Sequence, residues 1–336
     1  MSPPVLAAAP VDGHVHVIVS EITRTAAQDA SWHPHVHRDS SGAQLVEFGG
    51  RTLRSAVGEF VDIAAILAER ARFGIERVVL SPFVGLLGYD LEPGTARRVA
   101  RIQNSALAAA VRRFPDRVIA LGTVALQEPE QAARDLRSLM AEGELSGVEV
   151  AATVNGRLLG DDAFTAFWAA AEETGAVVFV HPTTRGIPLA GLEDYYLWNC
   201  VGNPLETTMA AAHLVLAGVL ERHPQLRIVL SHGGGAIRSL RGRIAHAHGF
   251  QAAARARLRE PVEASLRRFY FDTVTHDPVE LRALIDFAGA EHVLLGSDHP
   301  FDMGQLDPIA ALDAAGVDSI ERAMVLSGTA ARLFGG

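Results

Sequence analysis

The sequence contains no lysine, because all 30 of its basic residues are arginine. Several kinds of catalytic site depend on a lysine side chain, and each of them is excluded. A Schiff-base enzyme needs the lysine amine, and a P-loop needs the lysine that reaches the phosphates. A two-metal site bridged by a carboxylated lysine is excluded in the same way. Catalysis in this protein therefore rests on other groups.

Cysteine and long apolar runs are also scarce. Cys200 is the only cysteine, which excludes a disulfide framework and gives no sign of an oxidising compartment. We interpret it as a small buried apolar residue. No stretch approaches the length of a membrane span, and the first ten residues lack the basic start and apolar run of a signal peptide. The sequence predicts a cytoplasmic protein with no membrane partner.

A surplus of positive charge is absent as well. The formal net charge is -9 and the isoelectric point is near 5.9. The chain offers no basic surface to nucleic acid, so we expect no nucleic-acid partner. Its 336 residues, 49% hydrophobic and 21% charged, suffice for a large buried core.

Short apolar runs rich in β-branched residues alternate with longer helical patterns along the chain. Several runs are continuously apolar, as in parallel strands that are buried on both faces. The eight predicted strands are residues 11–19, 76–81, 117–124, 147–153, 176–181, 227–232, 269–274 and 292–297. Between the first two, Phe60, Ile63, Ala64 and Leu67 share one helical face. Gly74 is placed to end that helix before the next strand.

Eight units of strand plus helix in a chain of this length favour a closed barrel over an open sheet. A doubly wound sheet is the alternative, but no Gly-x-Gly-x-x-Gly follows the first predicted strand. The sequence therefore predicts an α/β protein with a (β/α)8 TIM barrel. We expect a single domain over residues 1–336, with an irregular insertion after the first strand at about residues 20–55.

Five polar side chains fall at the carboxyl ends of these predicted strands, the face where barrel enzymes assemble their active sites. His14 and His16 end the first strand and, two residues apart, project to the same side. His181 ends the fifth strand, His232 the sixth and Asp298 the eighth. Three imidazoles and a carboxylate suit Zn²⁺ and leave room for a water. Mn²⁺ and Fe²⁺ are alternatives.

We assign His232 to catalysis rather than to the metal, and we assign Asp298 to both catalysis and metal binding. A metal-bound water of lowered pKa needs a base to take its proton, and a neutral imidazole is suited to that role. Glu149, in the fourth strand, is expected to face the barrel interior, but with no lysine beside it one metal per chain is favoured over two. We interpret the histidines at positions 33, 35 and 37 as part of a solvated loop.

These motifs resemble those of the amidohydrolase superfamily, and more narrowly of its decarboxylase branch, typified by the 2-amino-3-carboxymuconate-6-semialdehyde decarboxylases. The resemblance is carried by His14-Val15-His16, His181-Pro182, His232-Gly233-Gly234-Gly235 and Gly296-Ser297-Asp298-His299-Pro300. It implies that His14, His16, His181 and Asp298 match zinc ligands, one ion per chain. It also implies that His232 matches the base that activates the metal-bound water.

The same resemblance implies two arginines that hold substrate carboxylates. One matches Arg243 and is donated across a dimer interface, so a homodimer is expected. The other matches Arg54, with Arg51 as the alternative. The chain departs from the family pattern at Trp198-Asn199-Cys200 and at Thr183-Thr184-Arg185, both near the expected substrate pocket, where Arg185 is a further candidate anchor.

The leading hypothesis is a metal-dependent, non-oxidative decarboxylase whose substrate is a small unsaturated or aromatic carboxylic acid. A second hypothesis keeps the metal site but changes the reaction to hydrolysis or hydration of a lactone, an amide or a C–C bond, because one fold hosts many reactions. A third is a binding or assembly protein that has kept the barrel and a structural metal. Turnover assays separate the third hypothesis from the first two.

Overall fold

Eight parallel strands form two sheets in the computed structural model, which describes residues 9–25, 34–40, 42, 44–48, 51–54, 59–183 and 190–335. One sheet has the order β1 (Val11–Val17), β5 (Arg77–Pro82), β6 (Val118–Ala120). The other has the order β13 (Val293–Leu294), β12 (Tyr270–Asp272), β11 (Arg227–Leu230), β10 (Val177–His181), β7 (Gly147–Ala151). Parallel bridges between Gly122 and Val148 and between Val15 and His299 join the two sheets. The strands therefore close into the predicted (β/α)8 barrel.

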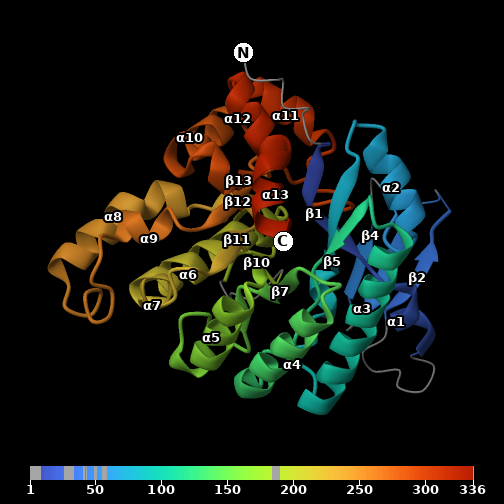
Figure 1. Ribbon diagram of the computed structural model, residues 1–336, viewed down its shortest axis with the longest axis horizontal. Helices are drawn as coiled ribbons and strands as arrows, with labels where there is room; N and C mark the ends of the chain where they lie inside the picture. The colour runs from blue at the N-terminus through green and yellow to red at the C-terminus, as the bar shows by residue number, and fades with distance from the viewer. Residues whose placement is uncertain are drawn as a thin grey trace.

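Helices surround the barrel strands, which lie at the centre of the molecule (Figure 1). They are α1 (Ser20–Thr25), α2 (Ile63–Ala71), α3 (Pro93–Arg113), α4 (Pro129–Glu142), α5 (Thr165–Thr174), α6 (Asn203–Leu216), α7 (Val219–Arg222), α8 (Ile237–Phe250), α9 (Val262–Leu266), α10 (Pro278–Ala288), α11 (Pro308–Ala314), α12 (Ser319–Ala323) and α13 (Thr329–Phe334). Local sequence sets their ends. Asp277 caps the start of α10 and Pro278 opens it, whereas Gly175 ends α5 in the left-handed conformation. Among the described helices, none is long and apolar enough to cross a membrane.

Apolar side chains pack in two places, outside the strands against the helices and inside the barrel. The inner cluster consists of Val11, Val79, Leu121, Val177, Phe179, Val229, Leu294, Ala330 and Leu333. Ala330 and Leu333 belong to α13, which crosses the middle of the barrel in Figure 1. Because Val11 and Val177 are the first residues of their strands, α13 covers the amino end of the barrel. The carboxyl end of the barrel is not covered by α13 and can accommodate a functional site.

All eight predicted strands overlap observed ones, but most observed strands are shorter at their carboxyl ends. β11 ends at Leu230 and β13 at Leu294, so two of the predicted site residues lie beyond the strands. His232 begins a short 3-10 turn, η6 (His232–Gly234), with a φ of 56°, and Asp298 has a φ of 58°. The backbone turns away from the sheet at these positions, which apolar periodicity does not reveal.

The prediction of an irregular insertion is wrong for much of residues 20–55. An antiparallel sheet forms there from β2 (His35–Arg38), β3 (Gln44–Phe48) and β4 (Arg51–Arg54). The central strand β3 pairs with both neighbours, and its Val46 is completely buried. His35 and His37 therefore lie in a strand rather than in a loop, and His33 lies outside the described residues.

The turn after β11 depends on glycine. Gly233, Gly234 and Gly235 all have positive φ, and this turn leads the chain from His232 into α8. A Cβ atom at Gly235 would overlap the carbonyl oxygen of Pro204 in α6. Close contact between the turn and α6 thus requires a residue without a side chain.

We expect Gly235→Ala to lower the free energy of unfolding by about 2–6 kcal/mol, because backbone strain and steric overlap each cost about 1–3 kcal/mol. Denaturant midpoints measure the effect. Gly175→Ala is the matched control, since Gly175 also has a positive φ (66°) but a Cβ atom there meets nothing within 4 Å. Equal losses in the two variants would contradict the role of the contact with Pro204.

Candidate metal centre

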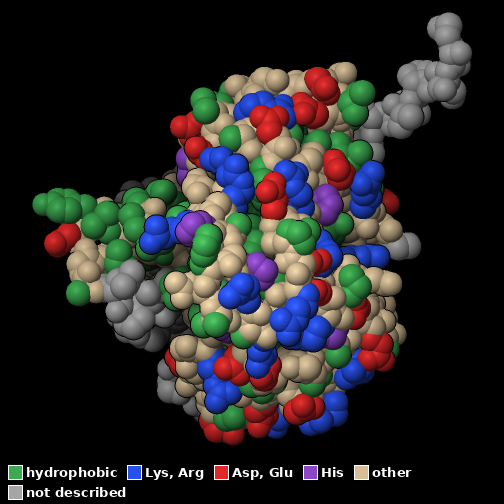
Figure 2. Space-filling model, turned by 90° about the vertical axis from the view of Figure 1, so that its left-hand side faces the viewer, with side chains coloured by type: hydrophobic (Ala, Val, Ile, Leu, Met, Phe, Trp, Pro, Cys, Tyr) green, Lys and Arg blue, Asp and Glu red, His purple; other side chains and the backbone are tan. Residues whose placement is uncertain are grey.

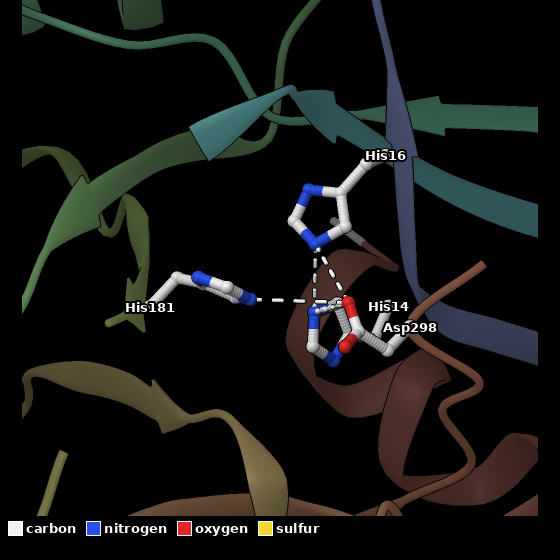
Figure 3. A group of neighbouring side chains, drawn as sticks. All are labelled: His14, His16, His181 and Asp298. Carbon is white, nitrogen blue, oxygen red and sulfur yellow. Dashed lines mark hydrogen bonds and ion pairs between the residues drawn. The ribbon is translucent and has the colours of Figure 1, made fainter. Parts of the chain in front are cut away.

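Four predicted ligands converge at the carboxyl end of the barrel (Figure 3). His14 and His16 project from β1, His181 ends β10 and Asp298 follows β13. One donor atom from each of the four lies within 4.8 Å of all the others, and all four residues are buried. Asp298 Oδ1 lies 3.3 Å from His14 Nε2, 3.1 Å from His16 Nε2 and 3.8 Å from His181 Nε2. The structure thus brings together the whole set.

These distances fit a single cation. Four donors held about 2.0–2.2 Å from one Zn²⁺ lie about 3.3–3.6 Å apart in a tetrahedron. Two of the buried donors, His181 Nε2 and Asp298 Oδ1, have no hydrogen-bond partner among the described residues. A buried polar atom without a partner is costly, and a cation between these atoms would satisfy both.

The tautomers of the three histidines also fit a metal. Each Nδ1 faces an oxygen that can only accept a hydrogen bond: Asp272 for His14 (2.7 Å), the Pro82 carbonyl for His16 (3.1 Å) and the Pro182 carbonyl for His181 (2.8 Å). The Nδ1 atoms therefore carry the protons. Each Nε2 lone pair is left facing the centre, as a metal ligand requires.

The electrostatics of the cluster favour a positive charge at its centre. Burial acts to raise the pKa of Asp298, but the four surrounding histidines outweigh it and hold that pKa well below its usual range. Burial acts to lower the pKa of His16, but Glu149 and Asp298 raise it to about 9. Burial lowers the pKa of His181 to about 3, so this imidazole is neutral and ready to donate its lone pair.

Asp272 is the supporting residue to which sequence reasoning gave no role. Besides bonding His14, its carboxylate accepts the backbone N–H groups of His232, Gly233 and Val274. Burial acts to raise its pKa, but the bond to His14 and the other contacts lower it. Asp272 thus orients one ligand and also fixes the turn that carries His232. An acidic residue within the apolar run of the seventh predicted strand was the available signal.

Two further buried carboxylates lie beside the centre. Asp12 accepts hydrogen bonds from the backbone N–H and the hydroxyl of Ser297, next to Asp298. Glu149 is completely buried, as expected for a residue facing the barrel interior, and its Oε2 lies 3.6 Å from His16 Nδ1. Burial raises the pKa of Glu149. Glu149 is not a member of the four-residue ligand group.

His232 lies beside the ligands. Its Nε2 is 3.2 Å from Asp298 Oδ2, and its ring centroid is 5.0 Å from that of His181. Burial acts to lower its pKa, but Asp298 and Asp272 outweigh that effect and raise it. His232 can therefore hold a proton at the edge of the centre.

A cavity of about 440 Å³ opens beside the four ligands, within the usual size range of small-molecule sites. Its wall includes His181, His232 and Asp298. The other lining side chains include Thr52, Phe83, Val84, Tyr196, Trp198, Asn199, Cys200, Asn203, Arg238, His276, Glu280, Phe301, Asp302 and Met303. The mixture of aromatic and polar groups suits a small, partly apolar acid.

Residues 198–200 line this cavity, as the departures from the family pattern predicted. The interpretation of Cys200 as a buried apolar residue is wrong. Its segment forms a π-helix at the cavity wall, η5 (Trp198–Gly202), and the thiol is exposed. His276 also lines the cavity, whereas His299 is buried with Nε2 3.4 Å from Glu69.

The predicted substrate arginines are only partly described. Arg51 and Arg54 lie in β4, whose Thr52 lines the cavity, but their side chains are outside the described residues, as is Arg185. Arg243 is exposed on α8 and does not line the cavity of its own chain. Arg238, six residues after His232, does line it, and sequence reasoning missed this residue.

Known proteins share both the sequence pattern and the fold. The family model described as Amidohydrolase matches residues 11–336. A 2-amino-3-carboxymuconate-6-semialdehyde decarboxylase from Dictyostelium discoideum is 29% identical over 303 residues, covering 89% of this chain and 83% of the relative. The crystal structure of 5-carboxyvanillate decarboxylase from Sphingomonas paucimobilis has a TM-score of 0.81 at 24% identity, covering 97% and 98% of the two chains. The crystal structure of 5-carboxyvanillate decarboxylase from Novosphingobium aromaticivorans, in complex with manganese and a nitrobenzoic acid, has a TM-score of 0.78 at 19% identity. The match covers 98% of this chain and 96% of the other.

Elemental analysis of the purified protein should find close to one divalent transition-metal ion per chain. We expect His14→Ala and Asp298→Ala to lose most of that metal, because each removes a donor atom from the centre. His232→Ala is the matched control, since it removes a neighbouring imidazole that is not in the ligand group, and it should keep its metal. Full occupancy in both ligand variants, or equal loss in all three, would contradict this assignment.

Proposed function

This chain belongs to the amidohydrolase family, in its decarboxylase branch, and we propose that it removes CO2 from a small aromatic or unsaturated carboxylic acid. The sequence prediction of a metal-dependent carboxy-lyase is confirmed at the level of the family. The observation that supports the substrate class is the cavity, whose lining combines His181 and Asp298 of the four-residue ligand group with Phe83, Tyr196, Trp198 and Phe301. An aromatic ring fits between such side chains, and its carboxylate fits beside a cation.

We propose that His14, His16, His181 and Asp298 hold one Zn²⁺. Three imidazoles and one carboxylate suit zinc. Because a structural neighbour was solved with manganese, Mn²⁺ remains an alternative, as does Fe²⁺. The ion supplies a Lewis acid that polarises oxygens bound to it and lowers the pKa of a bound water.

The residues of the chain provide the proton transfer that decarboxylation requires. The bond between the ring or chain carbon and the carboxylate breaks, its electron pair stays on that carbon, and a proton must replace CO2. His232 is placed for this role, because its raised pKa lets it hold a proton beside Asp298. It donates this proton to the carbon as CO2 leaves, and a proton from solvent then restores the protonated imidazole. Asp298 holds both the cation and the His232 ring.

We propose that two arginines bind the negative charge of the substrate, since planar guanidinium groups match carboxylates in bidentate contacts. One is Arg54, or Arg51 in its place, on the strand whose Thr52 lines the cavity. The other is Arg243, donated by the partner in a homodimer. Its exposure on α8, away from the cavity of its own chain, is compatible with that role.

Exposed apolar side chains near Arg243 support the homodimer. On α8, Leu240 is 36% exposed and Phe250 is 72% exposed, and Met209 on α6 is 41% exposed. Figure 2 looks at the side of the molecule where α8 and α9 lie and shows hydrophobic side chains interspersed with arginines. Aromatic residues, Met and Arg are enriched in protein interfaces.

We further propose that residues 1–336 form one domain. The cytoplasmic location stays a prediction.

The assay that tests the reaction measures CO2 release from hydroxy-aromatic acids and unsaturated dicarboxylates. We expect CO2 in proportion to the substrate consumed, and Arg54→Ala or Arg243→Ala should weaken substrate binding by about 1.5–3 kcal/mol for each lost charge-assisted contact. Turnover of neutral esters, lactones or amides with ¹⁸O from water in the product acid, and without CO2, would replace this proposal by the hydrolase alternative. Lack of any turnover would favour the binding protein.

The dimer proposal is tested by mixing two inactive variants. His232→Ala should lose about 10²–10⁴ in kcat, the usual contribution of a positioned general acid–base group, and Arg243→Ala should bind substrate poorly. In a heterodimer of the two, one site receives both an intact His232 and an intact partner arginine. The heterodimer should therefore recover about half of the wild-type activity, because one of its two sites is complete. No recovery in an isolated heterodimer would contradict donation by the partner.

A further inference from the structure

We propose that Arg238 on α8 forms an anion subsite in the cavity and selects substrates that carry a second negative group away from the reacting carboxylate. This inference rests on the proposed decarboxylase function and adds a specificity-determining residue to it. Among the described residues that line the cavity, Arg238 is the only arginine. It is the second residue of α8 and follows His232 by six residues, and both residues line the cavity.

The guanidinium of Arg238 is held in place from one side. Its Nη2 donates a hydrogen bond to Glu280 on α10, which also lines the cavity. The Arg238 side chain is only 19% exposed, whereas that of Glu280 is 55% exposed. Nη2 to Glu280 is the one side-chain hydrogen bond that Arg238 makes to the described residues. A guanidinium has five N–H donors, so one edge remains available to a ligand.

Arginine at this position has a cost in the fold. Arg238 lies in the first turn of α8, where the helix macrodipole disfavours a cation, and that turn contains no acidic residue. Burying most of a charged side chain there is unfavourable unless it is paired. The half-exposed Glu280 is largely in water, and an ion pair of that kind contributes little. Stability of the helix therefore does not explain the residue, whereas an anionic ligand in the cavity does.

Other lining residues of the cavity are aromatic. Tyr196, Trp198 and Phe301 present aromatic rings, and Asp302 is engaged by the Tyr196 hydroxyl at 3.1 Å. A substrate ring that directs its reacting carboxylate to the four ligands can place a second substituent elsewhere along the lining. Among the described lining residues, Arg238 is the one that offers a permanent positive charge. A second carboxylate or a phenolate on the ring is the chemistry that this guanidinium recognises.

The test compares two probes that differ by one carboxylate, benzoate and isophthalate (benzene-1,3-dicarboxylate), by calorimetric titration of the metal-loaded protein. We expect isophthalate to bind the wild type more tightly than benzoate. Arg238→Met should weaken isophthalate by about 10- to 100-fold, in line with the loss of a charge-assisted contact. It should change benzoate by less than about 3-fold. Arg238→Lys should recover part of the loss, because it restores the charge without the bidentate fork.

Arg282→Met is the matched control. Arg282 lies on α10 with a side chain 26% exposed, pairs with Glu321, and does not line the cavity. It should leave the affinities for both probes unchanged. Glu280→Gln provides a second test that keeps the guanidinium. Removing the competing carboxylate should leave isophthalate binding as tight as in the wild type, or tighter. Metal content and thermal unfolding of each variant show whether the fold is intact.

Two results would overturn the subsite: isophthalate binding no tighter than benzoate in the wild type, or an equal effect of Arg238→Met on both probes. Failure of the decarboxylase function is a separate outcome. If the enzyme released no CO2 from any acid while Arg238→Met selectively weakened isophthalate, the reaction would be wrong and the subsite would stand. If CO2 release were confirmed and the two affinities fell together, only the subsite would be wrong.

Discussion

Three imidazole lone pairs and one carboxylate oxygen point at the same small volume at the carboxyl end of the barrel, and they are buried there together. Without a positive charge at their centre, such an arrangement leaves polar atoms unpartnered in a region of low dielectric. A cation resolves this conflict. The surrounding structure is arranged to keep the four donors in place: the bridges that close the barrel bring β1 beside the segment after β13, so that His14 and His16 face Asp298.

The groups behind the ligands determine how the centre works. The Nδ1–H group of each of the three histidines donates a hydrogen bond to an oxygen that can only accept one, which leaves the Nε2 lone pair for the cation. Asp272 links this arrangement to the proposed proton carrier, because the carboxylate that bonds His14 also accepts a hydrogen bond from the backbone of the turn that carries His232. The turn that carries His232 also depends on Gly235, because only a residue without a side chain lets the turn lie against α6. The proposed proton carrier His232 and the cavity-lining Arg238 therefore lie on one short stretch of chain, and Asp272 links that stretch to His14 of the metal centre.

Different residues of the cavity lining serve the proposed reaction and the proposed specificity. His181, Asp298 and His232 line the cavity at the centre where the reacting carboxylate is proposed to bind. Aromatic rings in the lining match the unsaturated part of the proposed substrate, and Arg238 adds a positive charge. Such a division is expected of a barrel in which loops from different strands contribute independently.

The sequence by itself determined the barrel and the four residues that converge at the candidate metal centre. Continuous apolar runs mark strands that are buried on both faces, and parallel strands in a barrel end at a common face, so polar residues at their carboxyl ends must meet. It did not determine the sheet of β2, β3 and β4, the covering of the amino end by α13, the exposure of Cys200, or the roles of Asp272 and Arg238. Those features depend on contacts between segments far apart in the chain, such as Asp272 with His14 and Arg238 with Glu280. Apolar periodicity reports which side of one segment is buried, and only the tertiary structure decides which distant polar group lies opposite.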